Sequence, residues 1–297
     1  MSSTEIVYVV SPDLNYQYQL FASLRSLLAS GTSFDRIVIF CVGKRPKYWE
    51  FEDSRIVVEE VKNLNENYFF INKTHVCNRD AERLIFLDAD TIIMKPIDSI
   101  YKNINSDLLA RPVMGYPNSI WERSLVLEKW DLQKWVELLG MVGANPGTPY
   151  FNSGFFICQN GSHQKLSKIW LELYQRLLVG DPMALFKAKW SEQAAFSLAV
   201  GVAGLSYHLL DRTAHCYAFS REKELFKDAI VYHTGGRFFW NHAARIESFL
   251  AIKDLDLPKF KGSNLFNPIS FHRQLRHNYF YQNLKRIYGL IKQKLKN

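Results

Sequence analysis

The chain contains little cysteine, and its cysteines follow no metal-binding spacing. Only four of the 297 residues are cysteine, and they are scattered along the sequence as Cys41, Cys77, Cys158 and Cys216. The absence of a C-x-x-C pair and of zinc-ligand spacing argues against a cysteine-based metal site. Three of the four lie in or beside apolar runs, which is typical of buried, reduced thiols. We therefore expect a cytosolic protein.

The sequence also lacks long apolar runs. No stretch reaches the roughly 18 apolar residues that a membrane-spanning helix needs. The first residues, Met1-Ser2-Ser3-Thr4-Glu5, lack the basic region and the apolar segment of a signal peptide. We expect a cytoplasmic protein that is either soluble or bound peripherally to a membrane.

Residues 1–270 carry almost no net charge. The formal net charge of the whole chain is +8, but residues 271–297 hold seven Lys and Arg residues and no Asp or Glu, which leaves +1 for the rest. A nucleic-acid groove needs basic residues along one face of the fold. The near-neutral body therefore argues against a nucleic-acid partner.

The basic segment 271–297 has a helical apolar stripe. Leu284, Ile287, Ile291 and Leu295 recur at helical spacing, with Lys and Arg beside them. A basic amphipathic helix is typical of a membrane-surface anchor. A helix packed on the body, or a solvated chain end, is the alternative.

Alternating apolar runs and helical patterns predict an α/β fold. The apolar runs at 6–10 and 36–42 predict strands, and the helical pattern at 16–29 between them indicates a parallel sheet. Further strands are predicted at 56–59, 84–87, 108–110, 150–158 and 229–233, and helices at 67–80, 96–101, 121–139, 162–178 and 191–200. No internal repeat or low-complexity segment is visible. The simplest organisation is one α/β domain over 1–257, followed by a basic extension over 258–297.

Two carboxylates follow the apolar strand 84–87 directly, as Asp88 and Asp90. Side chains two residues apart in a strand project to the same side, so the two like charges would repel without a neutralising group. Hard oxygen ligands suit Mg²⁺ or Mn²⁺, and the carboxyl ends of strands in open α/β sheets are where ligands bind. A metal site for a phosphorylated ligand is therefore the first hypothesis, and local capping by the two carboxylates is the alternative.

His233 ends a second apolar strand and is followed closely by Gly236 and Arg237. A neutral imidazole is a competent Mn²⁺ ligand, glycine lets a phosphate approach the backbone, and arginine supplies positive charge. A buried, hydrogen-bonded histidine beside a turn is the alternative.

Three further polar features can be interpreted either as functional residues or as purely structural ones. Asn152-Ser153-Gly154 interrupts an apolar strand, as either a sugar-binding site or a bulge with internal hydrogen bonds. Glu192-Gln193 stands at the head of a predicted helix, where Ser191 would serve as the N-cap. Lys73 lies in a polar break of a predicted helix, where a solvated lysine is the default expectation.

Taken in order, these motifs resemble the retaining glycosyltransferases of family 8, the glycogenin and bacterial lipooligosaccharide galactosyltransferase group. The resemblance covers roughly residues 5–240. The motifs that carry it are Ser11-Pro12-Asp13 with Tyr16, Lys73, Asp88-Ala89-Asp90, Phe151-Asn152-Ser153-Gly154, Glu192-Gln193 and His233 with Gly236. The chain departs from the family in having Glu-Gln for the usual Asp-Gln, and Phe238-Phe239-Trp240 where a lysine is usual.

The resemblance implies a GT-A fold and a metal-dependent transfer of sugar from a UDP-sugar, with retention of anomeric configuration. It implies that Asp88, Asp90 and His233 bind Mn²⁺ or Mg²⁺, and that Asn152, Glu192 and Gln193 surround the reacting sugar. It also implies donor contacts by Ser11, Asp13, Tyr16, Lys73, Asp88, Ser153, Gly236 and Arg237. The acceptor would be a glycan, a lipid-linked saccharide or a protein. A covalent nucleophile and a front-face route are both open.

Two other functions fit parts of the pattern. A haloacid-dehalogenase-like phosphatase would use Asp88 as nucleophile and Asp90 as acid and base, but it would place the motif at its first strand, and Gly180-Asp181 lacks the second aspartate of its later motif. A non-catalytic nucleotide-sugar-binding protein on the same fold is the other alternative.

Overall fold

The computed structural model describes residues 3–46, 49, 51–114, 132–179, 188–217 and 228–234. The predicted extension 258–297 lies outside these residues, as do Gly236, Arg237 and residues 121–131 of one predicted helix.

Seven strands form the main sheet, in the order β3-β2-β1-β4-β7-β6-β8. Their bounds are β1 Thr4–Val10, β2 Arg36–Val42, β3 Ile56–Val61, β4 Arg83–Leu87, β6 Leu108–Met114, β7 Tyr150–Cys158 and β8 Tyr207–Leu209. The first four strands, β3 to β4 in this order, are parallel. β7 is antiparallel to both β4 and β6. The parallel half therefore has its carboxyl ends at one edge of the sheet.

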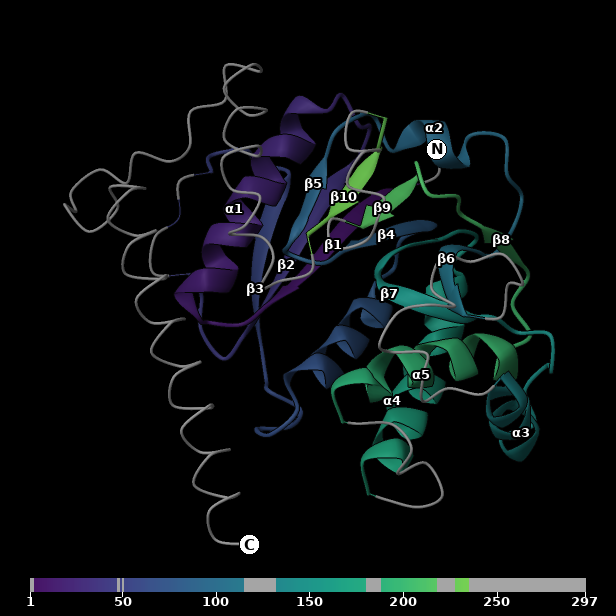
Figure 1. Cartoon of the computed structure of the whole chain (residues 1–297). Helices are drawn as coiled ribbons and strands as arrows, with labels where there is room; N and C mark the ends of the chain where they lie inside the picture. The colour runs from purple at the N-terminus through teal and green to yellow at the C-terminus, as the bar shows by residue number, and fades with distance from the viewer. Residues whose placement is uncertain are drawn as a thin grey trace, which may run out of the picture. The chain divides into compact units, whose positions relative to one another are not determined.

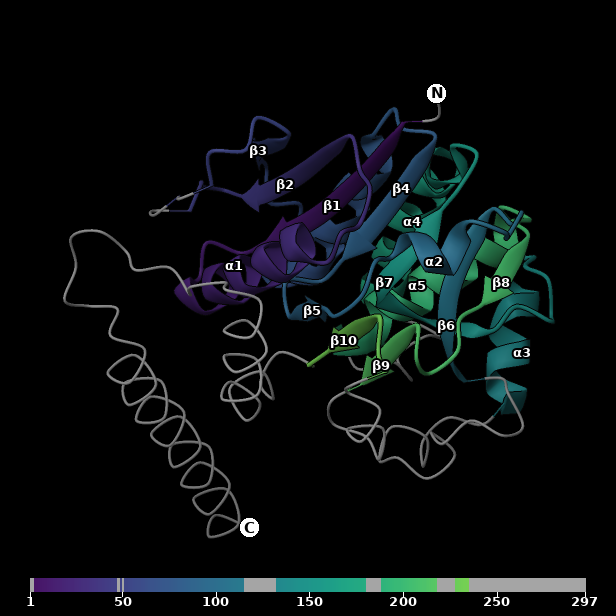
Figure 2. The same cartoon turned by 90° about the horizontal axis from the view of Figure 1, so that it is seen from above.

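Helices cover both faces of this sheet (Figures 1 and 2). α1 (Leu14–Ala29) packs on one face, while the 3-10 helix η1 (Phe69–Asn78) and α5 (Ala188–Val202) pack on the other. α4 (Ser162–Val179) packs against both η1 and α5. The short helix α2 (Asp98–Tyr101) and α3 (Leu132–Met141) complete the described helices. Because both faces are covered, the central strands are continuous apolar runs instead of alternating ones.

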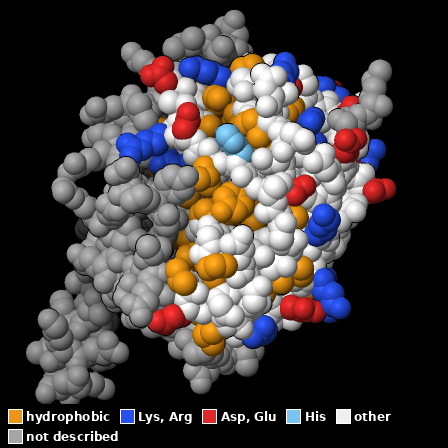
Figure 3. Space-filling view, turned by 90° about the vertical axis from the view of Figure 1, so that its right-hand side faces the viewer, with side chains coloured by type: hydrophobic (Ala, Val, Ile, Leu, Met, Phe, Trp, Pro, Cys, Tyr) orange, Lys and Arg blue, Asp and Glu red, His pale blue; other side chains and the backbone are white. Residues whose placement is uncertain are grey.

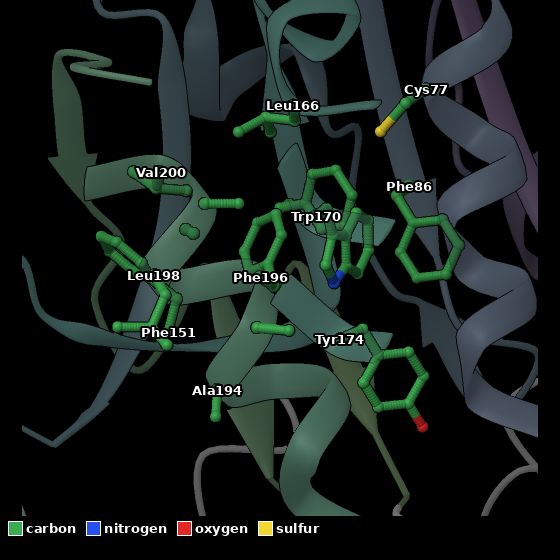
Figure 4. Close-up of a cluster of buried hydrophobic side chains, with 14 of the residues drawn as sticks. Cys77, Phe86, Phe151, Leu166, Trp170, Tyr174, Ala194, Phe196, Leu198 and Val200 are labelled. Carbon is green, nitrogen blue, oxygen red and sulfur yellow. The ribbon is translucent and has the colours of Figure 1, made fainter. Parts of the chain in front are cut away.

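The core between the sheet and α4 and α5 is aromatic (Figure 4). Phe86 of β4 stacks on Phe156 of β7 with ring centroids 5.0 Å apart. Phe156 in turn lies 4.7 Å from Phe196 of α5, and Trp170 of α4 closes the cluster at 4.9 Å from Phe196. These fully buried rings fix β4 and β7 side by side, and the candidate site lies at the end of this pair.

A second sheet of three short strands adjoins the carboxyl end of β4. It has the order β5-β10-β9, formed by Thr91–Ile93, Val231–His233 and His215–Tyr217. β10 is antiparallel to β5 and parallel to β9. Since only three residues separate the end of β4 from the start of β5, these residues join the two sheets.

The predicted α/β class is confirmed, and several elements differ in detail. The predicted helix at 67–80 is the 3-10 helix η1, and β5, β8 and β9 were not predicted as strands. The predicted helix at 191–200 begins at Ala188, so Ser191 lies inside the helix and the prediction of Ser191 as its N-cap is wrong. Trp135 of α3 is buried in the core.

The face shown in Figure 3 carries acidic and basic side chains interspersed among small groups of apolar ones. None of the helices in the described residues combines the length and the apolar character that crossing a bilayer requires. All four cysteines are free and buried, as expected.

Candidate metal centre

Three potential metal ligands converge at the junction of the two sheets. Asp88 and Asp90 lie in the turn between β4 and β5, and His233 is the last residue of β10. His233 Nε2 lies 3.2 Å from Asp90 Oδ1 and 3.8 Å from Asp88 Oδ2. One ligand atom from each residue falls within a group no wider than 4.8 Å. The structure thus brings the three predicted ligands together. Asp88 and Asp90 reach the same place through a turn, and not through the alternation of side chains along a strand.

Backbone pairing holds the turn in place. Asp88 N donates to Gly154 O at 2.8 Å, which ties the turn to β7. Thr234 N and Thr234 Oγ1 both donate to Asp90 O, at 3.0 and 2.7 Å, which ties it to the end of β10. The pairing of His233 with Thr91 completes the arrangement. The positions of all three ligands therefore depend on main-chain hydrogen bonds.

The donor set and its spacing fit a divalent cation such as Mn²⁺ or Mg²⁺. Two ligands of an octahedral metal, each about 2.1 Å from it, lie about 3.0 Å apart when adjacent and about 4.2 Å apart when opposite. The 3.2 and 3.8 Å separations lie in this range. Carboxylates suit hard divalent cations and imidazole is a common ligand of divalent metals, so these three side chains together could hold such an ion.

Lys73 joins this centre to a buried glutamate. Lys73 Nζ lies 2.9 Å from Asp88 Oδ1 and 3.4 Å from Glu192 Oε1. All three side chains are largely buried, at 7%, 21% and 5% exposure. The expectation of a solvated lysine is therefore wrong, because η1 turns Lys73 inward beneath the aspartate.

The charges of this cluster shift one another's pKa values. Burial raises the pKa of Asp88 and of Glu192, and the Lys73 ammonium opposes both shifts. Burial would lower the pKa of Lys73, but the two carboxylates outweigh it and raise that pKa. The same balance holds at His233, whose pKa is raised because Asp90 and Asp88 outweigh its burial. The cluster therefore holds an excess of carboxylate that a cation would neutralise.

Gly154 of β7 makes room for this arrangement. A Cβ at this position would collide with the His233 ring and would lie 2.8 Å from Asp88 Oδ2. The main chain of β7 therefore runs directly against two of the ligands. Glycine is required here for close approach, a reason that the sequence pattern did not reveal.

Polar residues of β7 and α5 continue the site beyond the metal ligands. Asn152 Oδ1 accepts a hydrogen bond from Gly154 N at 2.8 Å, so this motif in β7 has an internal hydrogen bond of the kind expected for a bulge. Ser153 is buried beside Glu192. Gln193 Oε1 is buried without a hydrogen-bond partner among the described residues. An unpaired buried acceptor is costly unless a bound molecule supplies a donor.

The loop after β1 lies at the same edge of the main sheet as the metal ligands. Because β1 and β4 are parallel neighbours, Ser11 and Asp13 follow β1 at the edge where Asp88 follows β4. Tyr16, in the first turn of α1, is 37% exposed and stacks on Phe69 with ring centroids 6.2 Å apart. Burial and the negative charge of Asp90 raise the pKa of Tyr16, which indicates that it lies near the centre.

One residue of the centre, His215 of β9, was missed altogether. Its Nε2 lies 3.1 Å from His233 Nδ1. Burial, followed by the positive charges of His233 and Arg111, lowers the pKa of His215 well below its usual value. Only the strand pairing of β9 with β10 brings the two histidines together, so no local sequence pattern could have revealed the contact.

Comparison with known proteins gives the same fold and a family. The sequence model of the Rhodobacterales glycosyltransferase domain matches residues 6–204. No curated protein matches the chain significantly. The galactosyltransferase LgtC, solved with donor and acceptor sugar analogs, is similar with a TM-score of 0.57 and 14% identity over 86% of this chain and 98% of LgtC.

Two further solved structures show the same fold. The bifunctional glycosyltransferase WbbM has a TM-score of 0.51 at 12% identity, over 86% of this chain and 52% of WbbM. The glycosyltransferase GlyE of Streptococcus pneumoniae TIGR4 has a TM-score of 0.51 at 10% identity, over 89% of this chain and 66% of GlyE. Since the family match spans well over half of the sequence, this protein belongs to the Rhodobacterales glycosyltransferase family, a glycosyltransferase with the GT-A fold.

Proposed function

We propose that this glycosyltransferase transfers a sugar from a UDP-sugar to a saccharide, a lipid-linked saccharide or a protein, with Mn²⁺ or Mg²⁺ bound at Asp88, Asp90 and His233. The observation that carries the proposal is the convergence of these three side chains at the carboxyl end of β4, with Lys73 and Glu192 beside them. LgtC, which shares the fold, was solved with donor and acceptor sugar analogs. Membership of a glycosyltransferase family also makes the phosphatase alternative wrong.

The cation held by these three ligands would act on the UDP leaving group. A bound divalent cation supplies Lewis-acid neutralisation of the diphosphate charge. Asp90 and His233 lie 3.2 Å apart and would hold it with Asp88. Lys73 holds Asp88 in place and brings a further positive charge to the diphosphate side. We also assign Gly236 and Arg237 to this side, as the resemblance implies.

The sugar would lie over β7 and the start of α5. The unpaired Oε1 of Gln193 suits a sugar hydroxyl as its donor. Asn152 and Ser153 offer further polar groups on β7, and the carboxylate of Glu192 lies within reach of Lys73. These four residues would surround the anomeric carbon, and we propose transfer with retention of configuration.

The nucleotide base would lie on the α1 side. In the loop that leads into α1, Ser11 is half-buried and Asp13 is exposed, and the ring of Tyr16 is partly exposed. A uracil ring stacked on Tyr16 would continue its existing stack on Phe69.

Hydrolysis of UDP-sugars tests the proposal. Purified protein is incubated with UDP-glucose, UDP-galactose or UDP-N-acetylglucosamine in Mn²⁺ or in EDTA, and released UDP is quantified. We expect UDP release from at least one donor, dependent on the metal. Binding of UDP with Mn²⁺ but no turnover with any donor or acceptor would instead support the non-catalytic alternative.

We further propose that the basic extension contacts an anionic membrane from the cytoplasmic side. The seven Lys and Arg residues of 271–297 support the contact, and the four free, buried cysteines agree with a reducing compartment. Replacement of Lys285, Arg286, Lys292 and Lys294 by Gln should release the chain from vesicles that contain phosphatidylserine. Unchanged sedimentation would contradict the membrane role.

A further inference from the structure

A second histidine lies directly behind the proposed metal ligand His233. The ring planes of His215 and His233 are 9° apart, and their centroids are separated by 5.3 Å. This separation is about the 3.1 Å Nε2–Nδ1 distance plus the two ring radii, so the rings meet edge to edge. This is the geometry of a hydrogen bond that lies in the plane of both rings.

The direction of this hydrogen bond decides whether His233 can bind a metal. A neutral imidazole carries one proton, and the nitrogen without it is the ligand. His233 Nε2 faces Asp90 and Asp88, so it must be the unprotonated nitrogen and Nδ1 must carry the proton. The proton on Nδ1 then points at His215 Nε2, which has to accept it.

His215 is held rigidly as this acceptor. It is fully buried, with the ring of Phe155 meeting it edge-on at 5.3 Å and the ring of Tyr217 4.8 Å away. The guanidinium of Arg111 donates to the carbonyl oxygen of His215 and lies 4.3 Å over the Tyr217 ring. Aromatic walls and a fixed main chain leave the imidazole little freedom to turn away from His233.

We propose that His215 is a positioning residue of the metal centre: by accepting the Nδ1 proton of His233, it fixes the tautomer and the ring orientation in which Nε2 binds the cation. The inference rests on the proposed metal role of His233. Partners of this kind behind a ligating histidine change metal affinity by about 10–100-fold when they are lost. β9, which contributes no ligand itself, thus becomes part of the metal centre.

Two substitutions separate an acceptor role from a packing role. His215→Phe keeps a ring in the aromatic pocket but removes the acceptor, whereas the amide oxygen of His215→Gln can reach the position of Nε2. We expect Mn²⁺ affinity, measured by electron paramagnetic resonance, to fall about 10–100-fold in His215→Phe and to stay within about threefold of wild type in His215→Gln. Equal affinity in the two variants would overturn the proposal.

His163 provides the matched control. It is another fully buried histidine, and its Nε2 contacts Arg79 O at 2.8 Å outside the centre. His163→Phe and His163→Gln should bind Mn²⁺ like the wild type. A loss in His163→Phe equal to that in His215→Phe would assign the effect to general destabilisation and overturn the proposal.

A spectroscopic measurement on the unaltered protein does not depend on how the variants fold. With diamagnetic Zn²⁺ in place of Mn²⁺, ¹⁵N chemical shifts of the His233 ring, assigned by comparison with His233→Gln, should show a protonated Nδ1. A protonated Nε2 in the Zn²⁺-loaded protein would overturn both the role of His215 and the binding of metal by His233 Nε2. Equal Mn²⁺ affinity in the two His215 variants, with Mn²⁺ still bound by the wild type, would overturn the role of His215 alone. Failure of the wild type to bind either metal would overturn the proposed function as well.

Discussion

Gly154 is the residue at which the main chain of the large sheet touches the candidate metal centre. Its lack of a side chain lets β7 lie against the His233 ring and against Asp88, which a Cβ would approach to 2.8 Å. The same residue accepts the hydrogen bond from Asp88 N through its carbonyl oxygen. One glycine therefore sets the distance between the sheet and two of the three ligands.

Gly154→Ala should disrupt the centre more than it destabilises the fold. The added methyl group must displace His233 or Asp88, so we expect Mn²⁺ affinity to fall at least about tenfold, within the range seen when ligand orientation is lost. Isothermal titration calorimetry measures the affinity directly. Gly140→Ala is the control, because it lies in α3 with no atom within 4 Å of the new Cβ. An unchanged affinity in Gly154→Ala would show that the ligands do not need this clearance.

The pKa of His233 gives the centre a defined pH dependence. Asp90 and Asp88 face the imidazole from the β4–β5 turn and raise its pKa, while Lys73 and His215 are its nearby basic neighbours. Without metal, this raised pKa contributes stability that is complete below pH about 6.5 and is lost as the pH rises through the folded-state pKa. A metal ion that binds His233 must displace the same proton. The affinity for the metal therefore rises as the pH rises, opposite to the stability of the metal-free protein.

Mn²⁺ affinity should therefore rise with pH through the folded-state pKa of His233, which lies above its ordinary value. Below that pKa the expected slope is about tenfold per pH unit, because one proton is displaced for each metal bound. Titrations between pH 6 and 8.5 would measure it. A flat profile would mean that His233 does not exchange a proton for the metal.

At the scale of elements, a chain of buried hydroxyl groups ties α1 to the turn that holds the aspartates. Tyr8 OH lies 3.0 Å from Ser23 Oγ, which lies 3.2 Å from Thr91 Oγ1. Thr91 Oγ1 donates to Asp88 O at 2.7 Å. In the next turn of α1, Ser26 Oγ accepts a hydrogen bond from Ile93 N at 2.9 Å. Polar groups on the inner face of α1 thus position β5 and, through it, the metal centre.

Ser23→Ala should cost about 1–3 kcal/mol in the free energy of unfolding, because it leaves the buried Tyr8 hydroxyl without this partner. Urea denaturation followed by circular dichroism measures the loss. Ser99→Ala should be close to neutral, because the Ser99 hydroxyl is exposed and donates to the nearby Pro96 O. Equal effects of the two substitutions would contradict the role of the hydroxyl chain.

The strands that the sequence predicts best are those whose apolar runs are long and end abruptly. The predicted ranges 36–42 and 150–158 coincide with β2 and β7. The three-residue strands β5, β8 and β9 are too short to show a period and exist only through pairing with partners distant in sequence. The helix predicted at 67–80 is present as η1, but its 3-10 geometry and its burial of polar residues, among them Asn72 and Lys73, were not predicted.

In the candidate site, too, local patterns predicted some residues and could not predict those that depend on contacts between distant strands. Asp88, Asp90 and His233 were predicted because each lies at the end of an apolar strand or just after it, and the structure brings them together. The reason for Gly154 and the contact of His215 could not be predicted, since both depend on how β7 and β9 approach β10 in space. The space that Gly154 leaves and the tautomer of His233 both arise only in the folded protein, so the order of residues along the chain does not reveal them.

At the scale of the molecule, one parallel sheet edge gathers the proposed nucleotide, metal and sugar contacts. β1 delivers the loop with Ser11 and Asp13, β4 delivers the aspartates, and antiparallel β7 contributes Asn152 and Ser153 as it enters the sheet. The small β5-β10-β9 sheet adds His233 from a distant part of the chain. The family match ends at residue 204, before this histidine. The proposed function therefore requires the later segment to complete the centre.

The most direct test of this account is the dependence of UDP binding on metal. Differential scanning fluorimetry would record the melting temperature with UDP in Mn²⁺ and in EDTA, for the wild type, for Asp90→Asn and for Asp228→Asn, an exposed aspartate near the opposite end of β10. We predict that UDP raises the melting temperature only with Mn²⁺, that Asp90→Asn abolishes this shift together with metal-dependent sugar transfer, and that Asp228→Asn retains both. A UDP-induced shift of equal size in EDTA, or in Asp90→Asn, would contradict the assignment of Asp88, Asp90 and His233 as the metal centre of this glycosyltransferase.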